Sequence, residues 1–282
     1  MKIYNPNISK QGIGGGWTFL RNLNKALLGK IEFVNTWQEC NIFFITSVTI
    51  VDKSEVFEAY KAGKKIVLRV DNMPRKSRNS RMSPHERMKE YAQMASAVVY
   101  QSNWAKEWIG SYIGFMEKSS IIYNGVDTEI FKPITKPERD YKIFMYIRYN
   151  RDENKRMPEA FDMFTEEWLK NNKHILWLVG RFSPELVQNN FDFFRGEKIK
   201  YWGVAETPEV MANFMRQADI LLYPSYSDAC PNTVTEAKAC GVEVWHRGHA
   251  GVGEAATIPE PGLERMGQEY LQLFKNICEL QL

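Results

Sequence analysis

Two carboxylates, Asp228 and Glu236, stand eight positions apart in the stretch YSDACPNTVTEAKACG. The small polar residues Asn232 and Thr233 lie between them. The preceding run DILLYPS is typical of a strand, and NTVTEAKAC is typical of a helix entry. Because the first N–H groups of a helix attract anions, we expect this turn to hold a phosphate. The two carboxylates would then accept hydrogen bonds from hydroxyl groups on different parts of the same ligand.

A simpler explanation fits the same spacing. Asp228 can be a loop residue, and Glu236 can be a carboxylate that interacts favourably with the helix dipole, which is worth less than about 1 kcal/mol. The spacing of the two acids leaves both explanations open.

A second candidate loop is rich in basic residues. The segment YIRYNRDENKR contains Arg148, Arg151, Lys155 and Arg156 and follows an expected strand. An arginine fork and a lysine point charge at a strand end can hold a diphosphate. A solvated charged loop is the alternative, and the composition does not choose between them.

Two more loops follow expected strands near the start of the chain. The glycines of GIGGG, at 12–16, precede a helical pattern and would let the backbone approach a ligand closely, although they are out of register with GxGxxG. Asp71 and Asn72 end the apolar run 65–70, where a side chain can face a ligand. A flexible turn and an Asx turn ahead of Pro74 are the respective alternatives.

Short apolar runs alternate with longer amphipathic stretches throughout the chain. The first part predicts strands at 1–4, 41–46, 65–70, 97–100 and 120–123, and helices at 16–28, 53–62, 84–95 and 103–111. The second part predicts strands at 141–147, 175–179, 199–202, 220–223 and 242–245, and helices at 158–170, 207–217, 232–239 and 260–282. Between the two parts, the proline-containing segment 131–140 is a linker by composition.

This alternation predicts an α/β fold of two Rossmann-like domains, each with a parallel sheet, that face each other across a cleft. We expect one domain at 1–132 and a second at 133–258, followed by a C-terminal helix at 259–282. A chain of 282 residues with 44% hydrophobic residues can bury two cores. Ligands of such sheets bind at the carboxyl ends of the strands, which is where the candidate loops lie.

The net charge of +3 is unevenly distributed. Residues 1–132 carry a net charge of +7 and the rest −4, and the segment Lys61–Lys89 contains ten basic residues against two acidic ones. This bias favours an anionic ligand or a contact with an anionic membrane surface, with a solvated loop as the alternative. No nucleic-acid-binding motif accompanies the segment, so a nucleic-acid partner is not expected.

The cysteines and histidines show no metal-ligand spacing. The four cysteines include no CxxC, and the four histidines include no HExxH, so we expect reduced, mostly buried thiols and no metal site. The chain opens without a signal-peptide pattern, and its longest apolar stretch, 42–51, is too short to span a membrane. A cytoplasmic protein is expected, and a peripheral membrane location through the basic segment stays open.

Four passages resemble the retaining glycosyltransferases of family 4, which have the two-domain GT-B fold. They are AVVYQSNWAKEWI at 97–109, IIYNGVDTEIFKP at 121–133, ADILLYPSYSDACPNTVTEAKACGVEV at 218–244 and RGHAGVGE at 247–254. The second passage matches the Asn-Gly-Val-Asp…Phe-x-Pro signature of that family. The likeness covers both expected domains in order, and the chain looks like a short member.

The resemblance implies a role for each residue of the stretch between the two acids. By match, Glu236 binds the nucleotide ribose, Asp228 contacts the transferred sugar, and the backbone of Asn232 and Thr233 meets the distal phosphate. Asp228 stands where the family has glutamate, which shortens the side chain by about 1.5 Å.

The other candidate loops also receive roles by match. The Arg and Lys pair that holds the diphosphate falls on Arg148 and Lys155, with Arg151 and Arg156 as alternatives for the arginine. Gly15 and Gly16 would lie near the phosphates and the acceptor. Asp71 stands where many relatives carry a histidine and is therefore a candidate catalytic residue.

The resemblance therefore implies a retaining, metal-independent transfer of a sugar from a nucleoside diphosphate sugar to an acceptor hydroxyl. The donor would be a UDP- or GDP-sugar, the acceptor a glycan, a lipid or another molecule, and no cofactor is needed. The C-terminal helix would pack back on the first domain. The alternative is a non-catalytic nucleotide-sugar-binding protein of the same fold.

Overall fold

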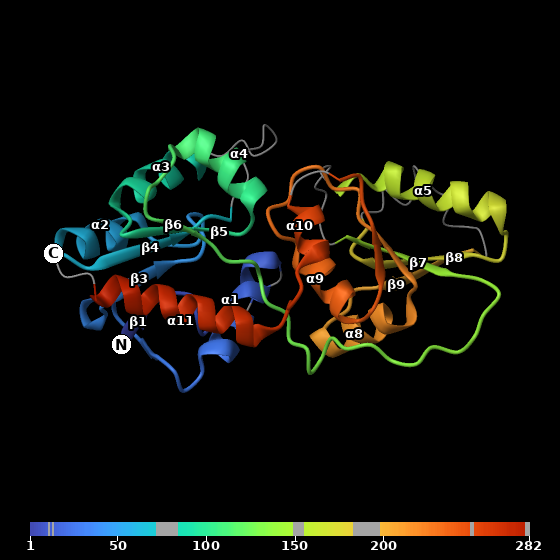
Figure 1. Cartoon of the computed structure of the whole chain (residues 1–282), viewed down its shortest axis with the longest axis horizontal. Coiled ribbons are helices and arrows are strands. Elements are labelled where there is room, and N and C mark those ends of the chain that lie inside the picture. Colours follow the sequence, from blue (N-terminus) through green and yellow to red (C-terminus); the bar gives the residue numbers. More distant parts are fainter. Residues whose placement is uncertain are drawn as a thin grey trace. The chain divides into compact units, whose positions relative to one another are not determined.

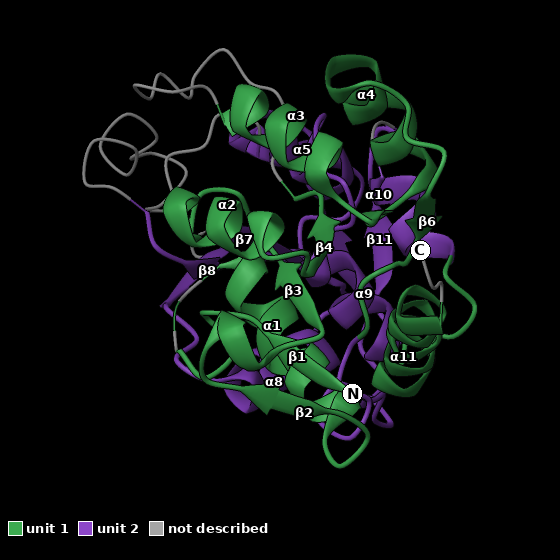
Figure 2. Ribbon diagram, turned by 90° about the vertical axis from the view of Figure 1, so that its left-hand side faces the viewer, with its two compact units in different colours: residues 1–125, 258–282 green, residues 126–257 purple. Residues whose placement is uncertain are grey.

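The computed structural model describes residues 1–10, 12, 14–71, 84–148, 155–182, 198–248 and 251–279 (Figure 1). The chain divides into two compact units. Unit 1 comprises residues 1–125 and 258–282, and unit 2 comprises residues 126–257 (Figure 2). The sequence-based linker suggested a boundary at 132, whereas the contacts divide the chain after Gly125.

Unit 1 contains a six-stranded parallel sheet with the strand order β2-β1-β3-β4-β5-β6. Its strands are β1 (Lys2–Tyr4), β2 (Glu32–Val34), β3 (Ile42–Ile45), β4 (Lys65–Arg69), β5 (Ala97–Tyr100) and β6 (Ser119–Ile121). Its helices are α1 (Gly15–Leu27), η1 (Trp37–Glu39), α2 (Lys53–Lys61), α3 (Pro84–Met94), α4 (Asn103–Ile113) and α11 (Leu263–Glu279). Helices α2, α3 and α4 cover one face of the sheet, and α1 and α11 cover the other (Figure 1).

Burial on both faces explains why the strands β3 and β5 of unit 1 are apolar throughout. All four residues of β3 are buried, and successive side chains face opposite layers. Phe43 packs edge-on against Tyr4 with ring centroids 4.9 Å apart. Phe44 instead contacts Tyr270 and Phe274 of α11 at 5.6 and 5.4 Å. The C-terminal helix therefore completes the core of unit 1.

The Asn-Gly-Val-Asp motif joins the two segments that make up unit 1. The Gly125 N–H donates to Met266 Sδ at 3.0 Å, and a Cβ added at Gly125 would lie only 2.9 Å from the Met266 Cβ. Arg265 donates to the carbonyl oxygens of Tyr123 and Asn124 at 3.0 and 3.2 Å. Glycine is required here because the backbone of α11 approaches too closely for any side chain.

Unit 2 contains a five-stranded parallel sheet with the order β11-β10-β7-β8-β9. Its strands are β7 (Ile143–Arg148), β8 (Ile175–Gly180), β9 (Ile199–Gly203), β10 (Ile220–Leu222) and β11 (Glu243–Trp245). Its helices are α5 (Met157–Lys170), α8 (Pro208–Gln217), α9 (Asn232–Ala239) and α10 (Val252–Thr257). The α5 side chains Phe161 and Phe164 share one core with Phe144 of β7. On the other face, Phe214 of α8 packs edge-on against Trp177 of β8.

The two parallel sheets confirm the predicted fold class, and among the described residues all but three short elements were expected from the sequence. The exceptions are β2, η1 and α10, which have three, three and six residues. The thiols of Cys40, Cys230 and Cys240 are buried, whereas that of Cys278 is exposed. Burial raises the pKa of Cys240 to about 11, so this thiol is protonated at neutral pH.

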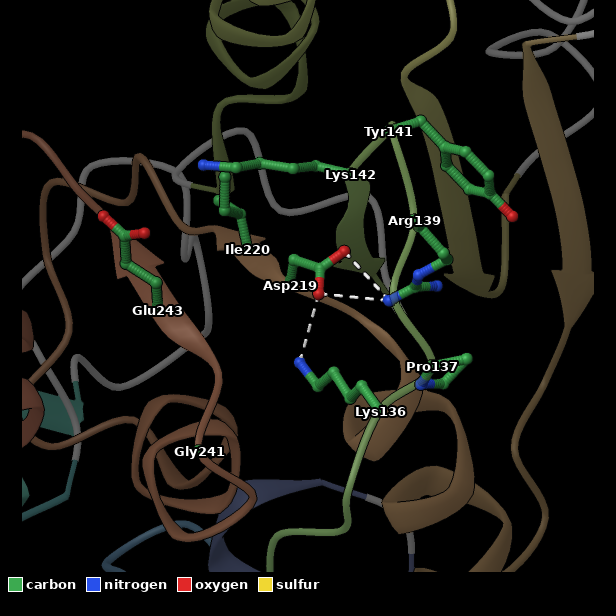
Figure 3. Close-up of a pocket in the computed structure, with 9 residues that line it drawn as sticks. All are labelled: Lys136, Pro137, Arg139, Tyr141, Lys142, Asp219, Ile220, Gly241 and Glu243. Atoms are coloured by element: carbon green, nitrogen blue, oxygen red, sulfur yellow. Dashed lines mark hydrogen bonds and ion pairs between the residues drawn. The ribbon is translucent and has the colours of Figure 1, made fainter.

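The segment that enters unit 2 is fixed to the amino edge of its sheet by Asp219. This carboxylate accepts hydrogen bonds from the Ile143 N–H at 2.8 Å and from Lys136 at 3.3 Å. Arg139 donates to both of its oxygens at 3.1 Å. Figure 3 shows Lys136 and Arg139 directed at Asp219 along the wall of a pocket of about 420 Å³. Because Asp219 precedes β10, this pocket lies at the edge opposite the carboxyl ends of the strands.

Replacing Asp219 should destabilise unit 2. In the Asp219→Ala variant, the Ile143 N–H and two cationic side chains lose their shared acceptor. We expect the free energy of unfolding to fall by about 2 kcal/mol, the scale of hydrogen bonds to charged groups. Urea denaturation followed by tryptophan fluorescence measures the change.

The matched control is Asp140→Ala, which removes a carboxylate from the same segment. The Asp140 carboxylate pairs with Lys173 at the surface, and both side chains are more than half exposed. Exposed pairs of this kind add little to stability, so its denaturation midpoint should match that of the wild type. Equal effects of the two substitutions would contradict the role assigned to Asp219.

Candidate functional site

The strand order of unit 2 reverses between β7 and β10. The chain proceeds from β7 outward to β8 and β9, then returns to place β10 on the other side of β7 and β11 beyond it. The connections that leave β7 and β10 therefore run to opposite sides, and the crevice between their carboxyl ends is where such sheets bind ligands. The two loops at this point carry Lys155 and Asp228.

A cluster of three polar side chains joins these loops. Lys155 donates from Nζ to Asp228 Oδ2 at 2.8 Å, and Tyr223 donates from its hydroxyl to the same oxygen at 2.7 Å. Lys155 Nζ also lies 2.5 Å from the Tyr223 hydroxyl and 4.8 Å from the centroid of its ring. The side chains of Lys155 and Asp228 are 24% and 22% exposed, so the pair is partly shielded but reachable by a ligand.

The residue after Lys155 makes a second link to the same loop. The guanidinium of Arg156 lies 3.8 Å from the centroid of the Tyr226 ring, and it is ion-paired with Glu159 in the first turn of α5. Arg156 has φ 49° and ψ 57°, which is the left-handed region. The loops after β7 and β10 are therefore joined at two adjacent points.

Helix α9 begins at Asn232, four residues after Asp228. Pro231 occupies the N-cap position, and a proline side chain offers no oxygen to the amides of the first turn. Its carbonyl accepts from Val234 at 3.0 Å and from Thr235 at 3.3 Å, so the helix begins at Asn232 as expected. The helix dipole concentrates partial positive charge here, which favours an anionic group.

Glu236 lies within α9, four residues after Asn232, and its side chain is half-buried. It is therefore one turn beyond the start of the helix, on the same side as Asn232. This position separates it from Asp228, which precedes the helix. The structure thus places one acid on each side of the amino end of α9.

The glycine-containing loop after β11 is attached to the same cluster. The Gly251 N–H donates to the backbone carbonyl of Asp228 at 2.8 Å, directly before α10 begins. His246 follows β11, and its Nδ1 accepts from the Gly248 N–H at 3.0 Å. Burial lowers the pKa of His246 below its ordinary value, which keeps Nδ1 unprotonated and able to accept this bond at neutral pH.

In unit 1, the glycine-rich helix entry and the end of β4 come together. Gly14 is the N-cap of α1 with φ 123°, and Gly15 and Gly16 form the first turn. A Cβ added at Gly16 would lie 4.0 Å from Asp71 Oδ2, so the Asp71 carboxylate is next to this turn. The structure brings together three of the predicted residues of unit 1, which are far apart in sequence.

A buried arginine supports this edge of unit 1. Arg69 is 2% exposed and donates to Gln101 Oε1 at 2.7 Å and to Asn124 Oδ1 at 2.9 Å. Its guanidinium stacks on the ring of Phe19 at 3.7 Å. These contacts tie β4, the residue after β5, α1 and the Asn-Gly-Val-Asp motif to one another, and so fix the position from which Asp71 projects.

The predicted site residues thus fall into two groups. Lys155, Asp228, Asn232, Thr233 and Glu236 lie at the carboxyl edge of the sheet in unit 2, and Gly15, Gly16 and Asp71 lie at that of unit 1. Arg148 ends β7, and the structure describes only its backbone. Arg151 and Asn72 lie outside the described residues, as does 72–83 of the basic segment Lys61–Lys89.

Sequence reasoning missed Tyr223 and Tyr226 as members of the site. Both stand within the quoted stretch around YPSY, at the end of β10. A tyrosine that ends an apolar strand is a weak signal, because the same residue is common in cores. Only the neighbouring position of β7 shows that Tyr223 meets Lys155.

Comparisons with known proteins identify the class of this architecture. Residues 142–262 match the family model for glycosyl transferases group 1. HepE (Alr3699) of Anabaena, solved with UDP and glucose, is 13% identical with a TM-score of 0.67, over 99% of this chain and 92% of that one. Sucrose-phosphate synthase of Thermosynechococcus elongatus is 14% identical with a TM-score of 0.64, over 98% of this chain and 96% of that one. A search of curated protein sequences gave no match.

A third solved structure, AviGT4, a glycosyltransferase involved in avilamycin A biosynthesis, is 12% identical with a TM-score of 0.64 and 98% coverage of both chains. Likenesses at these identities show the fold, which is the GT-B fold of glycosyltransferases. The residues that match the group 1 model, 142–262, lie almost entirely in unit 2. The prediction of a glycosyltransferase is confirmed at the level of this domain and fold.

No helix in the described ranges is both long and apolar enough to cross a membrane. Among the same residues, no three His, Cys, Asp or Glu side chains gather in a group that could hold a metal ion.

The stability of the chain should fall as His246 is protonated. Its folded-state pKa lies below 6.5, so below pH 6.5 the unfolded chain takes up a proton that the folded chain resists. This contribution to stability is fully present above pH 6.5 and is lost as the pH falls toward the folded-state pKa. Thermal denaturation between pH 7.5 and 5 measures the loss.

The matched variant is His246→Asn, whose side-chain oxygen can replace Nδ1 as the acceptor of the Gly248 N–H. It should lose less stability than the wild type over this pH range. His174, whose pKa burial also lowers, contributes equally to both proteins and cancels in the comparison. Identical pH dependences of the two proteins would show that His246 does not titrate as described.

Proposed function

We propose that this protein is a retaining, metal-independent glycosyltransferase of the family 4 type, which moves a sugar from a UDP- or GDP-sugar to an acceptor hydroxyl. The group 1 domain and the GT-B fold support the reaction class. The UDP and UDP-glucose complexes of HepE favour UDP as the nucleotide. The family resemblance supports retention at the anomeric carbon. No cofactor has a role in this proposal.

The observation that carries the proposal is the Lys155–Asp228 pair at the strand-order reversal of unit 2. It combines a cation that can bind a diphosphate with a carboxylate that can bind sugar hydroxyls, and the amino end of α9 follows directly. A diphosphate sugar needs these two kinds of group on adjacent parts of one site.

During transfer, the bond between the anomeric carbon and the diphosphate oxygen breaks, and the diphosphate leaves with the electron pair. The acceptor hydroxyl oxygen forms the new bond to the same carbon, and its proton passes to an oxygen of the departing phosphate. Negative charge grows on the departing phosphate, where Lys155, Arg148 and the first amides of α9 would stabilise it. Preorganised positive groups of this kind supply much of the rate enhancement in such reactions.

The remaining groups bind and orient. Glu236 would accept hydrogen bonds from the ribose hydroxyls of the nucleotide, because it lies one helical turn beyond the phosphate-binding amides of Asn232 and Thr233. Asp228 would accept hydrogen bonds from hydroxyls of the transferred sugar. In unit 1, Gly15 and Gly16 would allow a close approach of the acceptor side of the substrate, and Asp71 would bind the acceptor hydroxyl.

The structure also indicates a cost of donor binding. Lys155 is paired with Asp228 at 2.8 Å, so a diphosphate must compete with this carboxylate for the ammonium group. The shorter side chain of Asp228, relative to glutamate, is long enough to make this pair. Donor binding would therefore exchange the protein's own ion pair for one with the ligand.

A panel of UDP-, GDP-, ADP- and dTDP-sugars tests the proposal by thermal shift. The right donor raises the melting temperature, because a ligand at 100 times its dissociation constant stabilises the folded state by about 2.7 kcal/mol. Glu236→Ala should weaken the binding of this donor by about 10- to 100-fold, which corresponds to the loss of hydrogen bonds to a charged group.

Glu166→Ala is the control, since Glu166 is an exposed residue of α5 and lies outside the site. It should bind the donor like the wild type. A chain that responds to no nucleotide sugar would overturn the donor site. A chain that binds the donor through Glu236 without transferring or hydrolysing it would instead be the non-catalytic binding protein.

Asp228→Asn tests the competition for Lys155. Removing the carboxylate charge should tighten the binding of the nucleoside diphosphate product by about three- to tenfold, because the Asp228 carboxylate no longer competes for Lys155. The same variant should lower sugar transfer by about 100-fold. Isothermal titration with the diphosphate and a turnover assay with the sugar donor measure the two effects.

Lys155→Met is the opposite case and should weaken the binding of the same nucleoside diphosphate. Weaker binding of the diphosphate to Asp228→Asn would show that Asp228 does not compete for Lys155. The two variants therefore separate the role of the cation from that of its partner.

A further inference from the structure

Arg156 is the one residue other than glycine with positive φ in the part of the chain that the structure describes. Its φ of 49° and ψ of 57° bring the Cβ close to the following carbonyl oxygen, which is unfavourable for an L-amino acid. Such strain persists only where the surrounding contacts require it, and it concentrates at functional sites. Arg156 directly follows Lys155.

A second cost falls on the same residue. The Nε of Arg156 is buried and has no hydrogen-bond acceptor among the described residues. A buried donor without an acceptor opposes folding. Two unfavourable features in one side chain call for contacts that offset them.

Two contacts of Arg156 offset these costs. Its guanidinium lies over the Tyr226 ring at 3.8 Å, and its terminal nitrogen is ion-paired with Glu159. The ion pair fixes the guanidinium to α5, while the ring contact reaches the loop after β10. Arg156 thus connects a helix of the sheet's first crossover to the loop that carries Asp228.

The left-handed turn explains how two adjacent residues reach the same loop. In an extended chain, successive side chains point to opposite sides. The turn at Arg156 lets Lys155 contact Asp228 while Arg156 contacts Tyr226, two residues earlier. The loop after β10 is therefore held at both ends of the segment 226–228.

We propose that Arg156 is a positioning residue that holds Tyr226 so that Asp228 and Lys155 keep the geometry required for the donor. The inference rests on the proposed function for its catalytic consequence, but the loop contact itself does not depend on it. Arg156 acts through its guanidinium, which lies over the Tyr226 ring, so a lysine, which lacks this planar group, cannot replace it fully.

Arg156→Gly separates this role from backbone structure, because glycine adopts a φ of 49° without strain. The variant should melt within about 2 °C of the wild type, since the lost contacts are balanced by relieved strain. Amide hydrogen exchange of the segment 226–230 should become about tenfold faster, and kcat/KM for the donor should fall about tenfold. A purely structural arginine would lower the melting temperature and leave kcat/KM unchanged.

A double-mutant cycle with Tyr226→Ala tests whether the effect passes through the ring. Each single variant and the double variant should show the same tenfold loss, because removing either partner abolishes the same contact. Tyr226→Phe keeps the ring and should retain the exchange protection of the wild type. Losses that multiply to about 100-fold in the double variant would overturn the proposal.

The exchange measurement distinguishes the two proposals. Faster exchange in Arg156→Gly, in a chain that binds no nucleotide sugar, would retain the positioning role and reject the donor site. Unchanged exchange in a chain with full transferase activity would reject the positioning role and retain the proposed function.

Discussion

The ion pair between Lys155 and Asp228 depends on the order of strands in unit 2. Because β7 and β10 are adjacent in the sheet although far apart in sequence, the loops that follow them meet at one edge. Lys155, Tyr223 and Asp228 then satisfy one another with bonds of 2.5–2.8 Å. The strained turn at Arg156, the start of α9 and the attachment of Gly251 are all arranged around this contact, so a change in strand order would dismantle the site.

Unit 1 relies on a different kind of contact at its carboxyl edge. Arg69 is buried among amide oxygens and an aromatic ring, and its donors are directed at Gln101 and Asn124. Burial of a charge is costly, so its polar partners must be held in place. The same Asn-Gly-Val-Asp motif supplies Asn124 to this network and Gly125 to the packing of α11. The motif that contributes to the sequence resemblance therefore also holds the two segments of unit 1 together.

Regular alternation made most elements predictable, since strands buried on both faces are apolar runs and helices show an amphipathic period. The strand β2 was missed because it has only three residues, of which Val34 alone is buried, and this is too short for a distinct pattern. The boundary between the units was harder, because the linker 131–140 is irregular in composition but is fixed to unit 2 by Asp219. The amino-acid composition of such a segment indicates that it lacks regular structure, whereas its contacts decide to which unit it belongs.

The sequence by itself determined the α/β class and indicated the candidate loops, with Lys155, Asp228 and Glu236 among their residues, because these follow from local periodicity and from motifs at strand ends. Only the tertiary structure decided which candidates meet. It joined Lys155 to Asp228 and Tyr223, Arg156 to Tyr226, and Asp71 to the turn at Gly16. The physical reason is that these pairs depend on strand order and on close contacts between segments distant in sequence, and local propensity carries no information about either.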